Sequence, residues 1–305
     1  MVRSDKNYPS VYFGRPGAFV TLPWPREGID RSYERIVGDF ETGSGQHIVS
    51  KLVNGSRPHT LSWRSMHLDT YRLLEQYHVG SAGTGPWALI DPSVPNMLLP
   101  NQAAATNLLY DTTGFSASSG VLSSNAVTAN VHTTVGNRSL RWLWSSAPGA
   151  TTPTLNTTYG HRSWYGYPVV PGLSYAWSSW IKPDSVDPNI TVSMRLQWRT
   201  STNGVISEST GGDIAVTAWT QLSCIAVAPA TSAYVKPVWI VTGSTVAAGG
   251  SLYIDEPMLE QDTIVNAWAP GTGVKPMEIV SLSDSVPFNS RFRVASSMTL
   301  REVVK

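Results

Sequence analysis

The feature that most restricts the fold of this chain is a series of short runs in which apolar and polar residues alternate. The clearest run, ITVSMRLQWRT at 190–200, has apolar Val192, Met194, Leu196 and Trp198 alternating with polar Ser193, Arg195, Gln197 and Arg199. Successive side chains of a β-strand point to opposite faces, so one face of this strand packs and the other contacts water. Similar runs between Gly, Asn, Ser and Pro turns recur from about residue 106 to 261, and they predict a β-sandwich or barrel.

The first part of the chain has a different pattern. Residues 11–63 contain short alternating runs interrupted by Gly, Pro and an Asn-Gly pair, which are hairpin signals. In the segment SMHLDTYRLLEQYHVG that begins at Ser65, the apolar residues Leu68, Tyr71, Leu74 and Tyr77 recur at three-residue steps, and Gly80 follows as a helix stop. The sequence therefore predicts several strands followed by one amphipathic helix.

The segment 270–305 also has the pattern of strands, but it is too short to bury its own apolar residues. A two-stranded piece is marginal alone, so this segment must add to an existing sheet, and the N-terminal strands are the natural host. We therefore predict a mainly β protein. Residues 1–105 and 270–305 form one β domain with a single helix, and residues 106–269 form an inserted β-sandwich.

The charge of the chain argues against nucleic acid as a partner, because the formal net charge is +1 and charged residues make up only 14%. The sequence contains no long apolar run that could span a bilayer or serve as a signal peptide. We therefore expect synthesis in a cytoplasm and no membrane insertion. The single cysteine, Cys224, excludes an intrachain disulfide and a cysteine-based zinc site, and we expect it to be a buried strand residue.

No common catalytic motif is present, so we expect no enzyme. The sequence lacks a Gly-x-Ser-x-Gly elbow, a His-Glu-x-x-His pair and a phosphate-binding Gly-x-x-x-x-Gly-Lys loop, and its histidines are scattered. A glycoside hydrolase is the less favoured alternative, which would need a pair of carboxylates at a suitable separation. The candidates for such a pair are Glu208, Asp213, Asp255 and Glu260.

Sugar binding needs flat aromatic faces and a few planar polar side chains. In the strand YAWSSWIKP the alternation places Tyr175, Trp177 and Ile181 in the core, which turns Trp180 outward. The candidate carbohydrate-binding groove is then formed by Trp180, Arg195, Gln197 and Arg199 on a shared wet face. The alternative is that Trp180 packs under a loop or against the other domain. Four further tryptophans are expected in the core, namely Trp142, Trp144, Trp198 and Trp239.

Several segments of the central section carry a resemblance to a known family. They are TNLLYDTTGF at 106–115, YAWSSWIKP at 175–183, AVTAWTQLS at 215–223, AYVKPVWIV at 233–241 and GSLYIDEPMLEQ at 250–261. Through these segments the section resembles the carbohydrate-binding-module jelly rolls of the galactose-binding-like superfamily. In that family the closing strand ends on an aspartate, an apolar pair and a glutamate, which are here Asp255, Met258–Leu259 and Glu260.

The resemblance also implies a place for a structural calcium ion. In such jelly rolls a carboxylate on the closing strand helps to hold the chain ends, sometimes through calcium, so Asp255 and Asp111 are the candidate metal ligands. The family usually has Phe-Glu in its first strand, whereas here Phe115 is followed by Ser116, so one expected ligand is missing. The favoured alternative is that Asp255 accepts hydrogen bonds from backbone N–H groups of the first strand's turn. Pro257 is then expected to stop the strand from continuing as a central ladder.

The two ends of the chain carry a second resemblance, through RPHTLSW, LDTYRLLEQYHVG, GPWALIDPSVPNMLLPNQAAAT and WAPGTGVKPMEI. These segments are similar to minor tail proteins of long-tailed actinobacteriophages. The resemblance implies a distal-tail or tail-tip protein of the virion, made in the host cytoplasm. Its β domain would form a homo-oligomeric ring among other tail proteins, and its jelly roll would contact host-surface glycan or neighbouring subunits. A stand-alone carbohydrate-binding lectin or adhesin is the alternative.

Overall fold

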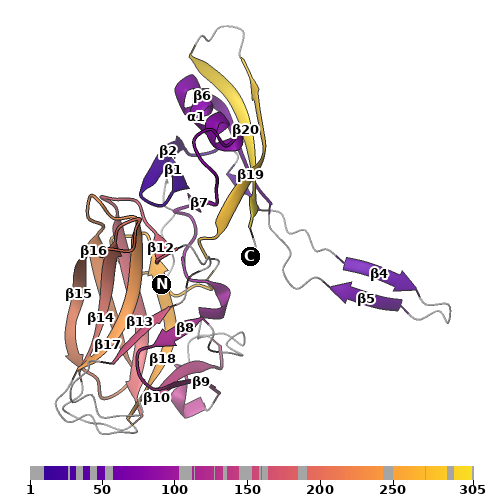
Figure 1. Ribbon diagram of the computed structural model, residues 1–305. Helices are drawn as coiled ribbons and strands as arrows, with labels where there is room; N and C mark the ends of the chain where they lie inside the picture. Colours follow the sequence, from indigo (N-terminus) through magenta and orange to yellow (C-terminus); the bar gives the residue numbers. More distant parts are fainter. Residues whose placement is uncertain are drawn as a thin grey trace. The chain divides into compact units, whose positions relative to one another are not determined.

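Figure 1 shows the computed structural model of the chain. It describes residues 10–26, 28–31, 37–41, 47–51, 58–102, 112, 114–126, 128–132, 136–143, 153–157, 159, 164–184, 191–242, 250–271, 273–286 and 292–303, with the backbone alone described for 37–41, 47–51 and 128. The described residues form mostly β-strands with one α-helix, so the predicted fold class is confirmed.

The chain divides into two compact units. The chain-end unit comprises residues 8–15, 19–89 and 275–305, and the sandwich unit comprises residues 1–7, 16–18 and 90–274. The sequence suggested section limits at 105/106 and 269/270, whereas the contacts divide the chain at 89/90 and 274/275.

A seven-stranded sheet forms the chain-end unit and combines strands from both ends of the sequence, in the order β2-β1-β7-β19-β20-β6-β3. The strands are β1 (Ser10–Arg15), β2 (Ala18–Pro23), β3 (Ile29–Asp30), β6 (Pro58–His67), β7 (Trp87–Ile90), β19 (Pro276–Ser285) and β20 (Arg293–Glu302). β19 pairs with β7 and β20 pairs with β6, so the prediction that the last segment joins N-terminal strands is confirmed. β4 (Val37–Glu41) and β5 (His47–Lys51) form a separate two-stranded sheet.

The predicted helix is α1 (Leu68–His78). The side chain of His67 accepts a hydrogen bond from the backbone N–H of Asp69 and caps the first turn, where the Asp69 carboxylate also favours the positive end of the helix dipole. After the helix Gly80 has φ +79°, a left-handed conformation that favours glycine. α1 buries Tyr71 and Leu74 in the core of the unit. In Figure 1 it lies against the long hairpin of β19 and β20.

Two sheets form the sandwich unit. The five-stranded sheet has the order β16-β13-β18-β10-β9, and the six-stranded sheet has the order β15-β14-β17-β11-β8 with β12 paired to β17. The strands are β8 (Phe115–Ala117), β9 (Val121–Asn125), β10 (Ser139–Leu143), β11 (Thr154–Thr157), β12 (Tyr167–Pro168), β13 (Ser174–Pro183), β14 (Thr191–Arg199), β15 (Val205–Ala215), β16 (Thr220–Val227), β17 (Tyr234–Thr242) and β18 (Ser251–Glu260). Two short 3₁₀ helices are η1 (Pro100–Gln102) and η2 (Thr128–Asn130).

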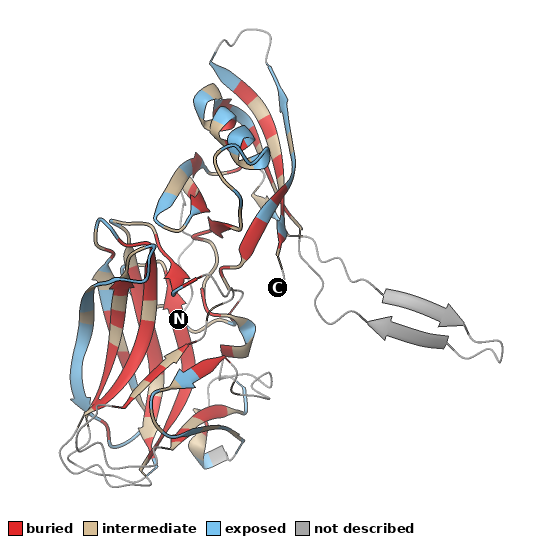
Figure 2. Ribbon diagram, viewed as in Figure 1, coloured by how far each residue is buried: buried red, intermediate tan, exposed pale blue. Residues whose placement is uncertain are grey.

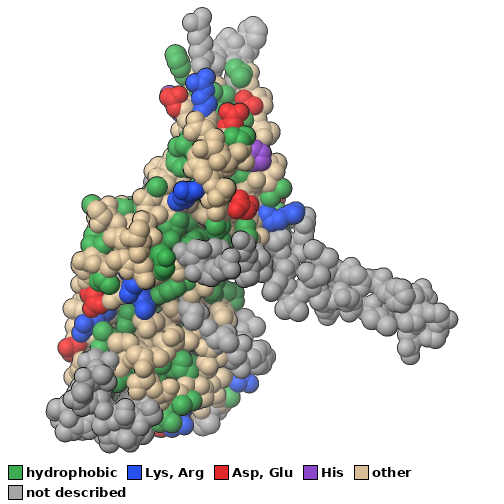
Figure 3. All heavy atoms as spheres, in the orientation of Figure 1, with side chains coloured by type: hydrophobic (Ala, Val, Ile, Leu, Met, Phe, Trp, Pro, Cys, Tyr) green, Lys and Arg blue, Asp and Glu red, His purple; other side chains and the backbone are tan. Residues whose placement is uncertain are grey.

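Aromatic side chains join the two sheets through the core. Trp177 of β13 meets Trp239 of β17 edge to face, with 4.6 Å between ring centroids, and the Trp239 indole N–H donates to the Ser179 hydroxyl at 2.8 Å. The predicted core positions Trp142, Trp198 and Trp239 are all buried, as is Cys224, whereas Trp144 lies outside the described residues. Figure 2 shows the contrast between the largely buried strands of the sandwich and the exposed edge strand β15. In the same orientation, Figure 3 shows charged side chains scattered singly or in small groups among hydrophobic and uncharged polar ones on the visible face.

β18 is a central strand between β13 and β10, and all its residues are buried. Pairing with β10 ends at Ile254, so β18 does not continue as a central ladder through Pro257, as predicted, whereas its pairing with β13 continues beyond the proline. The register to β13 shifts between Ser178 and Trp180, and Glu256 has φ +51°, so a β-bulge accommodates the proline and pairing resumes at Met258.

Asn96 ties the entry of the sandwich unit to its exit. Its side-chain amide N–H groups donate to the carbonyl oxygens of Pro257 and Ala269 at 3.1 and 2.9 Å. Its Oδ1 accepts from the N–H groups of Leu98 and Leu259 at 3.1 and 3.2 Å. These contacts explain why residues before 105 belong to the sandwich unit.

Candidate functional site

Three predicted site residues lie side by side on the outer face of the six-stranded sheet. Gln197 of β14 donates to Glu208 of β15 at 2.6 Å, and Arg195 Nη1 lies 3.3 Å from the other carboxylate oxygen. Arg199 Nε donates to Gln197 Oε1 at 2.8 Å, which fixes the orientation of the amide. The alternation of β14 thus gives a polar row with set donor and acceptor directions, whose three residues are partly exposed, whereas Ser193 of the predicted wet face is buried.

The neighbouring strand β17 extends this surface. Lys236 stands opposite Gln197 and Tyr234 opposite Arg199. Tyr165 packs edge-on against Tyr234 with 6.0 Å between ring centroids and is 38% exposed. Burial lowers the pKa of Lys236, and the positive charge of Arg199 lowers it further. We call Tyr165, Arg195, Gln197, Arg199, Tyr234 and Lys236 the polar face.

Trp180 does not belong to the polar face, so the predicted groove of four residues is wrong. Trp180 lies on β13 of the five-stranded sheet, whereas the other three residues lie on β14 of the six-stranded sheet. Its outward direction was correctly predicted, because Tyr175, Trp177 and Ile181 are fully buried on the opposite side of the strand. The His132 ring stacks on the indole at 3.9 Å between centroids, which is the predicted alternative of packing under a loop.

Asp255 lies close to Trp180 and is fully buried. Its two carboxylate oxygens accept from the backbone N–H groups of His132 at 2.8 Å and Glu256 at 2.9 Å. Burial raises the pKa of Asp255 to about 7 against the effect of these hydrogen bonds. The His132 Nδ1 atom lies 3.0 Å from Glu256 Oε1. Asp255 therefore anchors the segment after η2 to β18.

A calcium ion would need several oxygen ligands directed at one point, and the observed contacts of Asp255 are N–H donors. The other predicted ligand, Asp111, lies outside the described residues. Within the described ranges no three His, Cys, Asp or Glu side chains are grouped to hold a metal. The calcium site stays a prediction.

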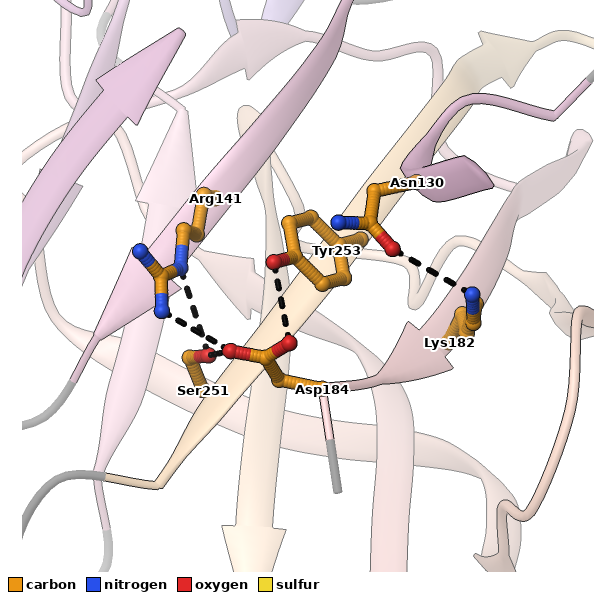
Figure 4. A network of polar contacts seen from close by, with 6 residues as sticks. All are labelled: Asn130, Arg141, Lys182, Asp184, Ser251 and Tyr253. Atoms are coloured by element: carbon orange, nitrogen blue, oxygen red, sulfur yellow. Dashed lines mark hydrogen bonds and ion pairs between the residues drawn. The ribbon is translucent and has the colours of Figure 1, made fainter. Parts of the chain in front are cut away.

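A second polar network lies on the five-stranded sheet and joins β10, β13 and β18 (Figure 4). Asp184 accepts from Arg141 Nη2 and from the Ser251 hydroxyl, both at 2.8 Å, and from the Tyr253 hydroxyl at 3.0 Å. Burial acts to raise the pKa of Asp184, but the hydrogen bonds from Ser251, Tyr253 and Arg141 outweigh it and lower the pKa. Since each oxygen of Asp184 is engaged by the protein, the network fastens the end of β13 to β10 and β18.

The carboxylates considered for glycoside hydrolysis fall on two sheets. Glu208 and Asp213 lie on β15 of the six-stranded sheet, and Asp255 and Glu260 lie on β18 of the five-stranded sheet. Glu260 accepts from the N–H and the side-chain amide of Asn266 at 2.9 and 2.7 Å. The structure therefore does not bring the four carboxylates together.

Sequence reasoning missed three residues that shape these surfaces. Lys236 could have been found, because the alternation in AYVKPVWIV places it on the same side as Tyr234. Tyr165 precedes the two-residue strand β12, which is too short to show a period. His132 follows η2 in a segment without periodicity, and no pattern in the sequence links it to Trp180.

Comparisons with known proteins give partial similarities. No family model matches the chain, and no curated protein matches it. Among solved structures, the enzymatically active domain of bacteriophage CBA120 tailspike protein 4 aligns at TM-score 0.40 and 12% identity over 57% of this chain and 22% of that chain. The CBM22-1 xylan-binding domain of Paenibacillus barcinonensis Xyn10C aligns at 0.35 and 12% over 53% of this chain and 92% of its own.

A third structure, TmCBM61 in complex with β-1,4-galactotriose, aligns at TM-score 0.36 and 13% identity over 55% of this chain and 99% of that chain. The chain spans less than a third of the larger enzymes that it matches, with 22%, 27% and 29% of their lengths covered. No helix in the described part of the chain has the length and apolar character needed to cross a membrane.

Proposed function

We propose that the sandwich unit binds a glycan on the polar face. The observation that carries the proposal is the exposed Tyr165 ring beside the fixed row of Arg195, Gln197 and Arg199. A tyrosine ring offers a flat apolar surface to the C–H groups of a sugar, and planar guanidinium and amide groups offer directed hydrogen bonds to its hydroxyls. Because the row is already oriented by internal hydrogen bonds, little side-chain entropy is lost on binding.

The polar face is a better candidate than the surface around Trp180. One face of the Trp180 indole is covered by the His132 ring, and Trp219 packs edge-on against that ring at 5.7 Å between centroids. Lys182 on the same side of β13 donates to Ala129 O and Asn130 Oδ1 at 2.8 and 3.3 Å. The His132 ring thus covers part of the flat apolar surface that Trp180 could offer to a sugar.

In this proposal the chain is a structural component of a phage tail tip, and the sandwich unit presents the glycan-binding surface. The supporting observation is the open edge of the chain-end sheet, where β2 pairs with β1 on one side and with no other strand among the described residues. A subunit can offer such an edge to a second copy, which allows a closed ring to form. No catalytic step is part of the proposal.

The glycan-binding proposal is tested on a glycan array with the full-length chain and two matched variants. Tyr165→Ala removes the aromatic surface of the polar face, and Trp180→Ala removes the ring on the other sheet. We expect Tyr165→Ala to lower the affinity for the bound glycans about tenfold, since aromatic contacts of this size contribute about 1 kcal/mol or more. Trp180→Ala should leave that affinity unchanged. Loss with Trp180→Ala alone would move the site to the five-stranded sheet, and no binding by the unaltered chain would contradict the proposal.

The tail assignment is tested separately by light scattering and negative-stain imaging at high protein concentration. A ring-forming protein should give closed multimers of one size, and Val20→Pro in the middle of β2 should reduce them because proline cannot donate to a strand ladder. Monomers that still bind glycan would favour a stand-alone lectin or adhesin. Release of reducing ends from a bound polysaccharide would instead favour the hydrolase alternative.

A further inference from the structure

Two cations on the polar face have no compensating carboxylate among the residues that the structure describes. Arg199 donates to neutral oxygens only, those of Gln197 and Asn203, and Lys236 has no ion-pair partner among the described residues. Glu208, which stands opposite Gln197, is already engaged by Arg195 and Gln197. Asp213 stands opposite Ser193, further along the strand. The end of the polar face at Arg199 therefore carries unbalanced positive charge.

Burial makes this unbalanced charge costly to the unliganded protein. Lys236 is only partly exposed, and its neighbours across and along the strands include Arg199, Gln197 and Tyr234. Two like charges held close at a partly buried surface repel each other more strongly than in water, because the local dielectric is lower. A bound anion would remove that repulsion and would be favoured over a neutral ligand of the same shape.

The tyrosines beside these cations supply the rest of a sugar site. Tyr234 and Tyr165 lie next to Arg199, and burial raises the pKa of Tyr234 to about 12, so its hydroxyl stays protonated and can donate.

We infer that the glycan bound by the polar face is acidic, and that Arg199 and Lys236 recognise an anionic group on the sugar. The inference rests on the proposed glycan binding and adds the chemical class of the ligand. A guanidinium can hold a carboxylate, sulfate or phosphate oxygen pair through two parallel hydrogen bonds, and the Lys236 ammonium adds a point charge beside it. Arg195 and Gln197, which Glu208 holds in place, form hydrogen bonds with the sugar hydroxyls in this arrangement.

The test measures binding of the full-length chain to three polysaccharides by titration calorimetry. Polygalacturonate carries carboxylates, dextran sulfate carries sulfate esters, and dextran is neutral. Arg199→Gln and Lys236→Gln each remove one charge, and Arg72→Gln on α1 removes an exposed charge from the chain-end unit as a matched control. Thermal melting confirms that each variant is folded, and Arg199→Lys tests whether charge alone is sufficient.

We expect an acidic polysaccharide to bind more tightly than dextran. Arg199→Gln and Lys236→Gln should each lower the affinity for it about tenfold, as expected for the loss of one charge-assisted hydrogen bond. The control should bind like the unaltered chain. The polysaccharide that responds to the variants identifies carboxylate or sulfate as the anion. Equal affinity for all three polysaccharides, or an equal loss of affinity with Arg72→Gln, would contradict the inference that the ligand is acidic. Neither result would contradict the proposed glycan binding. Absence of binding to any glycan would overturn both.

Discussion

Asp255 holds a carboxyl group at a position from which water is excluded. Its side chain is fully buried, its oxygens face two backbone N–H groups, and Glu256 beside it adds a second carboxylate. Burial raises the pKa of Asp255 from 3.8 to about 7. The folded state therefore keeps a proton that the unfolded chain releases, and this residue makes the free energy of unfolding depend on pH.

We predict that the contribution of Asp255 to stability is fully present below about pH 4 and is lost as the pH rises through about 7. A single group changes the free energy of unfolding by up to about 1.4 kcal/mol for each pH unit in that range. Urea unfolding between pH 4 and 8 measures the effect. The difference between the unaltered chain and Asp255→Asn isolates this residue from carboxyls such as Asp184, whose lowered pKa acts in the opposite direction. A difference that does not change with pH would contradict the prediction.

At the scale of elements, β15 is held against β16 at a glycine. A Cβ atom on Gly211 would lie 1.9 Å from the carbonyl oxygen of Ser223, and the Cys224 thiol contacts Ser209 O at 3.3 Å. β15 also has a bulge here, because the register to β14 shifts between Ser193 and Arg195. The two sheets of the sandwich thus approach each other closely along this edge.

We predict that Gly211→Ala lowers the free energy of unfolding by about 1–3 kcal/mol, because the backbone of β15 or β16 must move to admit the methyl group. Ser207→Ala on the exposed part of the same strand is the control and should change stability by less than about 0.5 kcal/mol. The midpoint of urea unfolding measures both. Similar midpoints for the two variants would show that β15 can move away from β16 at little cost.

The elements of the sandwich could be predicted from sequence to the extent that their period is local. The alternation of β14 and β13 gave the packed side of both strands and the outward direction of Trp180 correctly, but Ser193, predicted on the wet side of β14, is buried. The sheet to which each strand belongs depends on pairing between distant segments, and no local pattern records it. The groove that joined Trp180 to Arg195 failed for this reason. The bulge at Glu256 was missed because it appears only in the register with β13.

At the scale of the whole molecule, the chain-end sheet depends on its last two strands. β19 and β20 occupy central positions between β7 and β6, and β20 contributes Met298 and Leu300, which are fully buried. The sequence suggested this arrangement because the final segment is too short to fold alone. The position of these strands inside the order, rather than at its edge, was not predictable from their composition.

We predict that removal of residues 275–305 unfolds the chain-end unit and leaves the sandwich unit folded. Calorimetry of the complete chain should show two transitions, and the shortened chain should keep one of them. Met298→Ala should lower the free energy of unfolding of the chain-end unit by about 2–5 kcal/mol, as expected for a buried side chain of this size. Only the transition that is lost on truncation should therefore move to lower temperature. A single transition in the complete chain, abolished by the truncation, would show that the two units unfold together.

The four hydrogen bonds of Asn96 have a consequence for exchange of the sandwich unit between proteins. Asn96 lies in the segment that enters the sandwich unit, and its side chain is hydrogen-bonded to residues near the end of that unit. The junction is therefore held by residues of the sandwich unit itself. Recombination that moves residues 96–269 as a block would preserve these hydrogen bonds, whereas a crossover between residues 96 and 257 would destroy them. A sandwich unit closed in this way keeps the same junction wherever the whole block is placed.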